Sequence, residues 1–410
     1  MSERIRRLSL HIAHAVQGEV TVTPVSGNEQ WTFTYGATAT QDAALTMPRK
    51  LPTYIWDGVL PAFEQHLPEM DLSLFPAAIW KHITRDHAGM LWVAGQRRLG
   101  RIRFTRAGEA LTETLALNLS ESDIAAATDG DGLLADLLSR MTAIPGVSGV
   151  QPKVLLPLMA AGADPLRALG DTHLLKGNRP EYPYATTVEA ATLNLAAACG
   201  LTIPSHVLSQ DGRLLAVKRF DLDSNGSPLG FDEAASLMGL WARDKYTTSI
   251  EALHKSLLAF IPATKRRAFT RQLFTLVAFN LMVENGDAHL KNFGLLYADP
   301  DAASLAPVYD VLTTTCFAGM ERDLPALPLN GRKVWDDWSG FERLAISRGL
   351  TSAEMRQTLT GLASTMRTNL RSLPESYVDK VPDAALILKR MGEAWHRGLA
   401  RLEAHIGQSG

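Results

Sequence analysis

What the sequence lacks excludes several classes of protein. Its 410 residues include only two cysteines, Cys199 and Cys316, too few for a disulfide framework or a four-cysteine zinc site. We expect both to be plain core thiols. No stretch approaches the roughly 18 apolar residues of a membrane span, and the basic N-terminus lacks the apolar stretch of a signal peptide. The sequence therefore predicts a soluble, cytoplasmic protein without a membrane partner.

The chain also lacks an excess of charge of either sign. It carries 41 basic and 43 acidic residues, a net charge of -2, so no whole-chain field attracts nucleic acid or an anionic membrane. Basic residues cluster at 97–106 and 265–271, but neither cluster resembles a helix-turn-helix. We therefore expect contact with DNA only indirectly, through a partner. The length allows two or three domains.

The most informative stretch present is VENGDAHLKNF, at residues 283–293. A long apolar run before it and a shorter one after it predict that a buried helix delivers a polar loop and that a strand leaves it. Asp287 and Asn292 stand five residues apart, as phosphoryl transfer to a hydroxyl requires. The carboxylate accepts the hydroxyl proton and the amide oxygen holds Mg²⁺. Asp310, in VYDV, can supply the second metal ligand.

The N-terminal third predicts mainly strands. Residues 1–46 contain short runs that are apolar or alternate with a period of two. Residues 51–67 are expected to form a short helix between prolines, and residues 90–104 two strands. Arg101 and Arg103 share one face of the second strand. That face is either solvated or a docking surface for an acidic partner.

The next segments lead into a glycine-rich stretch. We expect a strand at residues 111–119, a helix at 120–127 capped by Ser120, a DGDG loop at 129–132 and a helix at 133–141. The DGDG loop lacks the further ligands of a calcium site. A domain boundary follows near residue 143. Residues 145–156, PGVSGVQPKVLL, can bring backbone N–H groups close to phosphate oxygens, although they are not a Walker A loop.

A lysine and a glutamate follow on successive elements. The apolar strand at residues 171–176 ends in Lys176, which either holds phosphates or is a surface lysine. The helix at 183–200, capped by Thr186 or Thr187, carries Glu189, 13 residues after the lysine. A pair between the two side chains would position the lysine. The strand at 214–220 can present backbone groups to the edge of an adenine ring.

The remainder of the chain is mainly helical by composition and periodicity. Residues 321–338 are rich in loop-forming residues. The expected helices are residues 233–240, 248–260, 264–283, 338–348, 352–371 and 378–405.

The order of these segments resembles that of the HipA-type serine/threonine kinases of bacterial toxin–antitoxin modules. The matching motifs are SGVQPK, a strand lysine, a helix glutamate, KRFD, NGDAHLKN and YD. The kinase core corresponds to residues 144–380, and residues 1–110 resemble the family's N-terminal subdomain more loosely. The resemblance implies an α+β, bilobed, protein-kinase-like fold. It has a β-rich N-terminal subdomain at 1–143, a nucleotide-binding α/β N-lobe at 144–231 and a mainly helical catalytic C-lobe at 232–410.

The resemblance also implies roles for individual residues. Asp287 becomes the catalytic base, and Asn292 and Asp310 become Mg²⁺ ligands. Lys176 binds the phosphates of ATP. Lys291 either neutralises charge on the transferred phosphoryl group or points to solvent. The other residues implied at the ATP site are Ser148, Gly149, Val150, Gln151, Lys153, Glu189, Lys218, Phe220 and His289.

Two positions depart from the family's pattern. The family's nucleotide loop carries a serine that is autophosphorylated and stops the enzyme, and Gly146 stands at that position here. Ser148, two residues later, is then the candidate for autophosphorylation. Lys218 stands where the family often has an acidic residue. Because the hinge contact there is made by the backbone, we expect the change to be tolerated.

The function implied is an ATP- and Mg²⁺-dependent serine/threonine protein kinase that acts as the toxin of a toxin–antitoxin pair. Its substrate would be a translation component such as an aminoacyl-tRNA synthetase, and its partner a HipB-like, DNA-binding antitoxin. One alternative is a nucleotide-binding pseudokinase that serves as a co-repressor module, although the complete set of Lys176, Asp287, Asn292 and Asp310 argues against it. Another is a kinase of a small-molecule or lipid hydroxyl, because the core geometry does not specify the acceptor.

Overall fold

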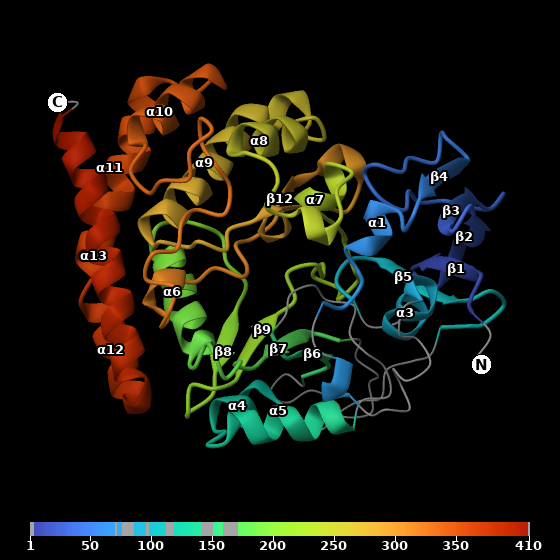
Figure 1. Cartoon of the computed structure of the whole chain (residues 1–410), viewed down its shortest axis with the longest axis horizontal. Coiled ribbons are helices and arrows are strands. Elements are labelled where there is room, and N and C mark those ends of the chain that lie inside the picture. Colours follow the sequence, from blue (N-terminus) through green and yellow to red (C-terminus); the bar gives the residue numbers. More distant parts are fainter. Residues whose placement is uncertain are drawn as a thin grey trace.

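Three parts make up the molecule in the computed structural model. A β-rich N-terminal unit, a four-stranded sheet with flanking helices, and a larger helical part are seen at the right, at the bottom and at the upper left of Figure 1. Among the described residues no helix is both long and apolar enough to cross a membrane. The residues that the structure describes are 4–69, 72–75, 86–95, 98–111, 119–140, 151–158 and 171–408.

The N-terminal unit is a five-stranded antiparallel sheet in the order β4-β3-β2-β1-β5. The central residues of β2 and β3 alternate between buried and more exposed side chains, and the buried aromatics Phe33, Phe63 and Phe104 pack edge to face in the core of the unit. This alternation is why the sequence favours a half-buried sheet. The strands are β1 (Arg7–Ile12), β2 (Ala15–Val25), β3 (Asn28–Tyr35), β4 (Thr53–Asp57) and β5 (Ile102–Arg106).

Two predictions for this unit were wrong. Residues 51–67 form β4 and only one helical turn, α1 (Pro61–Glu64), because the β-branched and aromatic residues of β4 pair with β3. Residues 90–104 contain the end of a helix, α3 (His87–Ala94), before β5. The buried residues of α3 recur at a spacing of three, which is a helical period, whereas we expected a strand.

The arginine face that we predicted to be solvated or to bind an acidic partner is neither. Arg101 is buried and donates hydrogen bonds to the carbonyl oxygens of Asp42 and Ala298, at 2.8 and 3.2 Å. Arg103 is half-buried and donates to the carbonyl oxygens of Gly100 and Ile102. Long cationic side chains here hold the N-terminal unit together and join it to the helical part.

The middle part is a four-stranded antiparallel sheet, in the order β6-β7-β9-β8, between two layers of helix. Its two faces belong to different cores: Leu215 and Val217 pack toward α6, and Leu214 and Ala216 toward α4 and α5. The elements are α4 (Glu121–Ala125), α5 (Gly130–Ser139), β6 (Lys153–Leu156), β7 (His173–Lys176), α6 (Ala185–Ala198), β8 (His206–Leu208) and β9 (Leu215–Lys218).

Helix starts in this part differ in detail from expectation. Ser120 caps α4 with a capping box, as predicted. The DGDG stretch is the first turn of α5, because the side chain of Asp129 accepts the N–H of Gly132 and begins the helix there. Neither threonine caps α6, since both lie inside it and Tyr184 is its N-cap residue. Residues 112–118 of the predicted strand at 111–119, and the boundary near residue 143, lie outside the described residues.

The helical part contains a three-stranded sheet, β10-β11-β12, and most of the chain's core. The strand β10 was not predicted. Cys316 is buried in this core, as expected, and Cys199 is half-buried. The elements are β10 (Gly230–Glu233), α7 (Ala234–Leu237), α8 (Ile250–Leu258), α9 (Arg266–Met282), β11 (Gly294–Tyr297), β12 (Ser304–Leu305), α10 (Trp338–Ser347), α11 (Ser352–Asn369), α12 (Ser372–Lys380) and α13 (Ala385–Gln408).

Short 3₁₀ turns connect these elements. They are η1 (Leu72–Leu74), η2 (Ala242–Asp244), η3 (Ala263–Lys265), η4 (Leu290–Asn292), η5 (Pro300–Ala302), η6 (Thr314–Cys316) and η7 (Pro382–Ala384). The η7 turn interrupts the single helix that we predicted for residues 378–405, because Pro382 lacks the N–H that a continuing helix needs.

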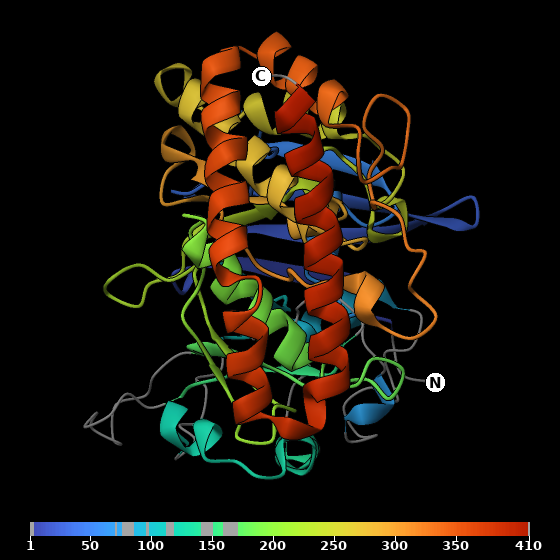
Figure 2. The same ribbon diagram turned by 90° about the vertical axis from the view of Figure 1, so that its left-hand side faces the viewer.

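The last helix, α13, holds the start of the polar loop at residues 283–293 in place through two arginines. It runs beside α11 and α12 along the face shown in Figure 2. Arg397 and Arg401 of α13 each donate to the carboxylate of Glu284 at 2.6 Å, and Glu284 is buried just before the predicted catalytic aspartate. Glu284 has a left-handed φ of 53°, so these ion pairs hold a backbone conformation that a non-glycine residue rarely adopts.

The N-terminal unit is fastened to both other parts. The N–H of Gly100 donates to the carboxylate of Asp221, just after β9, at 2.6 Å. The N–H of Leu45 donates to Asp232 of β10 at 2.9 Å. Both aspartates are buried, and buried charges persist only where such partners satisfy them. The three parts therefore meet at the junction between the middle part and the helical part, which are the two lobes.

Candidate active site

Two buried lysines lie opposite each other in the middle sheet. Lys153 begins β6 and Lys176 ends β7, and the two are direct partners in the antiparallel register. Direct partners project from the same face of a sheet, and like charges in this position destabilise it unless anions lie close by. Only 2% of Lys153 and 4% of Lys176 is exposed, and burial lowers the pKa of Lys153. The two ammonium groups therefore form a buried cationic site that favours binding of an anionic group.

Lys176 bridges the two lobes through carboxylates. Its Nζ donates to Glu189 Oε1 of α6 at 2.7 Å and to Asp310, which follows β12. Burial alone would lower the pKa of Lys176, but the Asp310 and Glu189 carboxylates raise it above its ordinary value. The predicted contact between Lys176 and Glu189 is confirmed, and the alternative of a surface lysine is wrong.

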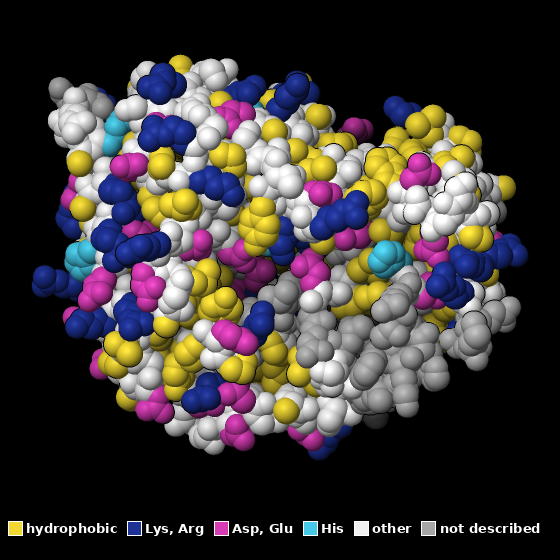
Figure 3. Space-filling model, viewed as in Figure 1, with side chains coloured by type: hydrophobic (Ala, Val, Ile, Leu, Met, Phe, Trp, Pro, Cys, Tyr) yellow, Lys and Arg dark blue, Asp and Glu magenta, His cyan; other side chains and the backbone are white. Residues whose placement is uncertain are grey.

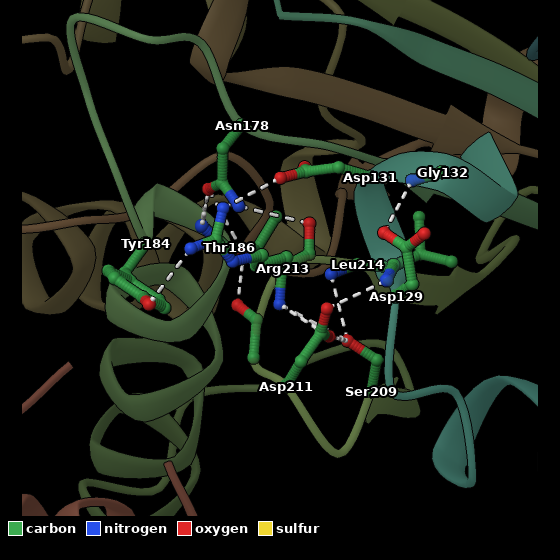
Figure 4. Close-up of polar contacts among 12 residues, drawn as sticks. Asp129, Asp131, Gly132, Asn178, Tyr184, Thr186, Ser209, Asp211, Arg213 and Leu214 are labelled. Atoms are coloured by element: carbon green, nitrogen blue, oxygen red, sulfur yellow. Dashed lines mark hydrogen bonds and ion pairs between the residues drawn. The ribbon is translucent and has the colours of Figure 1, made fainter. Parts of the chain in front are cut away.

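The turn between β8 and β9 contacts the start of α6 (Figure 4), the helix that carries Glu189. Arg213 donates to Asp131 of α5 at 2.9 Å and to the hydroxyl of Tyr184, the N-cap of α6, at 3.2 Å. The carbonyl oxygen of Gly212 accepts the hydroxyl of Thr187, in the first turn of α6, at 2.7 Å. Because these bonds join both helix layers across the sheet edge, the position of α6 is set by the turn.

We expect Gly212→Ala to destabilise the protein by more than about 1–2 kcal/mol, the usual cost of a left-handed L-residue. Gly212 has a φ of +70°, and an added Cβ would lie 2.5 Å from Thr187 Oγ1. Gly226→Ala is the matched control, because Gly226 has a φ of +79° with no atom within 4 Å of the added Cβ. Urea unfolding measures both variants, and equal losses would show that the turn does not position α6.

The predicted catalytic loop is held by side-chain amides at the end of α9. Asn280 of α9 accepts the side-chain amide of Asn285 at 2.8 Å, and Asn285 in turn accepts the N–H of Asp287 at 3.1 Å. A Cβ at Gly286 would lie 2.0 Å from the carboxylate of Asp323, so a larger residue here would displace that side chain. The sequence NGD therefore places the aspartate carboxylate by local hydrogen bonds.

Asn292 connects the loop to the segment that carries Asp310. Its side-chain nitrogen donates to the carbonyl oxygen of Asp287 at 2.8 Å and to that of Asp310 at 3.4 Å. Its amide oxygen is then the atom left for a cation. No cluster of three or more histidine, cysteine or acidic side chains suited to a metal occurs among the described residues. Two oxygen ligands nevertheless fit Mg²⁺, which completes its shell with phosphates and water.

Lys291 points away from solvent, so one of its two predicted roles is wrong. Its Nζ donates to Glu69 Oε1 at 2.5 Å and lies 3.5 Å from Glu233 Oε2, and only 3% of the residue is exposed. Lys245 donates to the other oxygen of Glu69 at 3.2 Å. Burial favours the neutral acid, but the two ammonium groups outweigh it and lower the pKa of Glu69 to about 2.

Glu69→Gln should lower the free energy of unfolding at pH 7 by about 1–3 kcal/mol, with the loss confined to pH values where the glutamate is charged. The folded pKa, about 2, lies below that of the unfolded chain, about 4.3, so the ion pairs stabilise above the unfolded value. The difference from wild type should then shrink as the pH falls from about 4.5 toward 2.

Urea unfolding at several pH values measures this difference. Glu393→Gln, at an exposed position of α13, is the matched control and should show little difference at any pH. A gap between wild type and Glu69→Gln that stays constant down to acid pH would contradict the ion-pair explanation.

Tyr246 and His289 complete the surroundings of Asp287. The hydroxyl of Tyr246, from the loop between η2 and α8, donates to Asp287 Oδ1 at 2.5 Å. The ring of His289 is buried, packs edge-on against Tyr246 at 5.1 Å, and its Nε2 lies 3.8 Å from the same oxygen. Burial lowers the pKa of His289, which favours the neutral imidazole.

An aromatic cluster lies at the other end of the site, next to the junction of the lobes. Phe220 stacks on Tyr309 at 5.4 Å and 25°, and Phe231 packs edge-on against both rings. Lys218, at the end of β9, is exposed. Its N–H donates to the carbonyl oxygen of Ser205, so that donor is already used. A flat, apolar surface of this kind suits a planar heterocycle.

Two adjoining cavities contain all the predicted site residues that the structure describes. The larger, about 340 Å³, includes the catalytic loop, Gln151 and Asp310, and the smaller includes the aromatic cluster; both are lined by Lys153. Acidic side chains are visible in a hollow near the middle of the face in Figure 3. The predicted positions Gly146, Ser148, Gly149 and Val150 lie outside the described residues.

Two residues of this site could not be found from any pattern in the sequence. Glu69 and Tyr246 belong to no motif, and their contacts with Lys291 and Asp287 span 222 and 41 positions of the chain. Only the folded arrangement of the N-terminal unit and of the η2 loop brings them to the catalytic loop.

Comparison with known families gives two matches along this chain. The model of the HipA-like C-terminal domain matches residues 146–370, and that of the HipA N-terminal domain matches residues 13–105. "Putative kinase Y4mE" of Sinorhizobium fredii is 30% identical over 254 residues, 59% of this chain and 60% of that protein. A "Putative kinase" of Haemophilus influenzae is 28% identical over 204 residues, 46% of this chain and 58% of that protein. The chain thus spans about three fifths of the length of these relatives.

A solved structure extends the likeness to the whole fold. The toxin–antitoxin complex of HipA, HipB and operator DNA from Shewanella oneidensis contains a chain that matches with a TM-score of 0.68 and 18% identity, over 98% of this chain and 97% of that one. The predicted α+β, bilobed, kinase-like fold with an additional N-terminal unit is confirmed.

Proposed function

Because the chain belongs to the HipA family, on the match of the C-terminal domain model to residues 146–370, we propose that it is an ATP- and Mg²⁺-dependent serine/threonine protein kinase. One observation carries the proposal. The paired lysines Lys153 and Lys176 face the same cavity system as Asp287 and Asp310. Paired buried cations beside oxygen ligands and a carboxylate base are what transfer of a phosphoryl group to a hydroxyl requires.

The proposed mechanism follows from what each side chain can do. Asp287 accepts the proton of the acceptor hydroxyl as that oxygen attacks the γ-phosphorus, and the bond from the γ-phosphorus to the β,γ-bridging oxygen breaks so that ADP leaves. Lys176, held by Glu189, binds phosphate oxygens in exchange for its contact with Asp310. Asn292 and Asp310 would hold Mg²⁺, which when bound offsets the charge of the triphosphate. The aromatic cluster around Phe220 would receive the adenine ring.

In this mechanism the fixed ammonium group of Lys291 provides positive charge beside the transferred phosphoryl group. Glu69 and Glu233 hold its ammonium group in the wall of the larger cavity, beside the catalytic loop. A buried cation that is already held in the cavity wall stabilises negative charge on the transferred phosphoryl group without reorganising during the reaction. The neutral His289 would pack against Tyr246 beside the base.

We further propose that the protein is the toxin of a toxin–antitoxin pair with a HipB-like, DNA-binding partner. The support is the Shewanella oneidensis complex, in which HipA is found with HipB and operator DNA, and whose fold extends over 98% of this chain. The whole-chain charge of -2 fits contact with DNA through a partner. A protein of the translation apparatus, such as an aminoacyl-tRNA synthetase, is the proposed substrate class.

Two measurements on the full chain test the kinase proposal. ATP with Mg²⁺ should raise the melting temperature through binding to the folded state, and ATP without Mg²⁺ should raise it less. Wild-type protein with [γ-³²P]ATP should label proteins of a bacterial lysate, and the labelled residues should be serine or threonine. Absence of both the thermal shift and the label would contradict the proposal.

A further inference from the structure

The hydroxyl of Tyr246 occupies the position where an acceptor hydroxyl must lie. It donates to Asp287 Oδ1 at 2.5 Å, the hydrogen bond that a substrate hydroxyl makes to a catalytic base before transfer. The phenol, Asp287, Asn292 and Asp310 line the same cavity of about 340 Å³. A phosphoryl group that entered this cavity, with a cation that Asn292 and Asp310 would hold, would therefore meet the phenol oxygen as well as the base.

The loop that carries Tyr246 is fixed to the catalytic loop. The N–H of Leu290, between Asp287 and Asn292, donates to the carbonyl oxygen of Lys245 at 3.1 Å. The Lys245 ammonium binds the same Glu69 carboxylate as Lys291 of the catalytic loop. One backbone bond and one shared carboxylate therefore set the distance between the phenol and the base.

The other end of the loop is tied to the N-terminal unit. The indole N–H of Trp241 donates to the carbonyl oxygen of Val59 at 2.8 Å. The N–H of Ala242 donates to the carboxylate of Glu64 at 3.1 Å. The phenol is thus delivered to the base by a loop anchored at both sides, although 42% of Tyr246 is exposed.

We propose that Tyr246 is an intramolecular phosphoryl acceptor, so that the protein autophosphorylates on this tyrosine. The inference rests on the proposed kinase activity. The phenol Oη attacks the γ-phosphorus of ATP, and the bond between the γ-phosphorus and the β,γ-bridging oxygen breaks. Asp287 takes the phenol proton, and ADP leaves with the bridging oxygen. The products are phosphotyrosine, ADP and the proton, which the carboxylate passes to solvent.

The protonation state of the phenol agrees with this step. Burial and the adjacent Asp287 carboxylate raise the pKa of Tyr246, so the phenol reaches the base with its proton at neutral pH. A protonated acceptor is the form that needs a general base. The other tyrosines near the site are differently engaged: Tyr309 donates to the carbonyl oxygen of Lys291, and Tyr182 packs its ring edge-on against Phe317.

The test uses the full chain, first dephosphorylated with a phosphatase and then incubated with ATP and Mg²⁺. Peptide mass spectrometry should find phosphate on Tyr246 in wild type and none in Asp287→Asn. Tyr246→Phe should lose this label, and the matched control Tyr54→Phe, whose phenol donates to the carbonyl oxygen of Pro48 in the N-terminal unit, should retain it. The fraction labelled per unit time should not depend on protein concentration.

ADP release and labelling of lysate proteins, measured in parallel, separate this inference from the kinase proposal. If wild type releases ADP or labels other proteins while Tyr246 stays unmodified, the inference is wrong and the kinase proposal stands. If the labelling rate of Tyr246 rises with protein concentration, transfer occurs between molecules and the intramolecular assignment is overturned. If neither ADP release nor any label is found, both fail.

Discussion

Asp287→Asn should reduce phosphoryl transfer from ATP by about 10²–10⁴-fold, the usual contribution of a positioned general base. The amide has the size of the carboxylate but cannot take the acceptor proton. Asp287 lies outside the cationic pair formed by Lys153 and Lys176, so the dissociation constant for ATP with Mg²⁺ should stay close to that of wild type. Initial rates of ³²P incorporation and titration calorimetry measure the two quantities separately.

A matched control distinguishes this effect from a general loss of charge. Asp301→Asn removes an exposed carboxylate from η5 that lines neither cavity of the site, and should leave both transfer and nucleotide binding unchanged. Because 48% of the Asp287 side chain is exposed, the Asn variant should also unfold at nearly the wild-type urea concentration. Transfer at the wild-type rate by the Asp287→Asn protein would remove this residue from the mechanism.

Lys176→Met should lower the free energy of unfolding by about 3–5 kcal/mol and abolish transfer. Methionine keeps the length of the side chain but leaves the Glu189 and Asp310 carboxylates without their shared partner, and removal of one member of a buried ion pair costs about this much. In wild type the ammonium group lowers the pKa of Asp310 despite its burial. Without it, one carboxylate should take up a proton as the pH falls.

The destabilisation by Lys176→Met should therefore be greatest at neutral pH and smaller in acid, because stability that depends on ionised carboxylates is lost there. Urea unfolding at pH 7 and pH 5 measures the change. Lys255→Met, at an exposed position of α8, is the matched control and should change stability by less than about 0.5 kcal/mol. A Lys176→Met protein as stable as wild type would show that the charged triad is not what holds the lobes together.

The predictions that the structure confirms depend on local spacing. The stretch NGDAHLKN places Asp287 and Asn292 in one loop because two side-chain amides close short hydrogen-bonded rings. Asn285 accepts the N–H of Asp287, and Asn292 donates to the carbonyl oxygen of Asp287. Lys176 could be placed at a strand end because the run before it is apolar. Its contact with Glu189 was predicted because an amphipathic helix that carries the glutamate was expected to follow the strand.

Contacts made only by tertiary folding could not be predicted. The carboxylate of Glu69 reaches Lys291 from another part of the molecule, and no periodicity in the sequence records that approach. The same holds for Tyr246, whose loop is positioned by Val59 of the N-terminal unit. Lys291 was left between two roles for this reason, since its burial depends on Glu69 and Glu233.

Secondary structure was predicted least well where local preference and pairing compete. Residues 51–67 are apolar enough for a helix, but β4 gains cross-strand partners in β3, among them Trp31 opposite Trp56. The helix α6 was expected to be capped by threonine. The hydroxyls of Thr186 and Thr187 instead donate to the carbonyl oxygen of Gly212, a partner that the fold supplies from a distant turn.

The proposed function requires that the two lobes enclose one site in which ATP and Mg²⁺ meet the base. A crystal structure of the protein with Mg²⁺ and a non-hydrolysable ATP analogue would show whether they do. We predict phosphate oxygens at Lys153 and Lys176, and the metal on oxygens of Asn292 and Asp310. A nucleotide bound elsewhere, or a metal held without either ligand, would contradict the account.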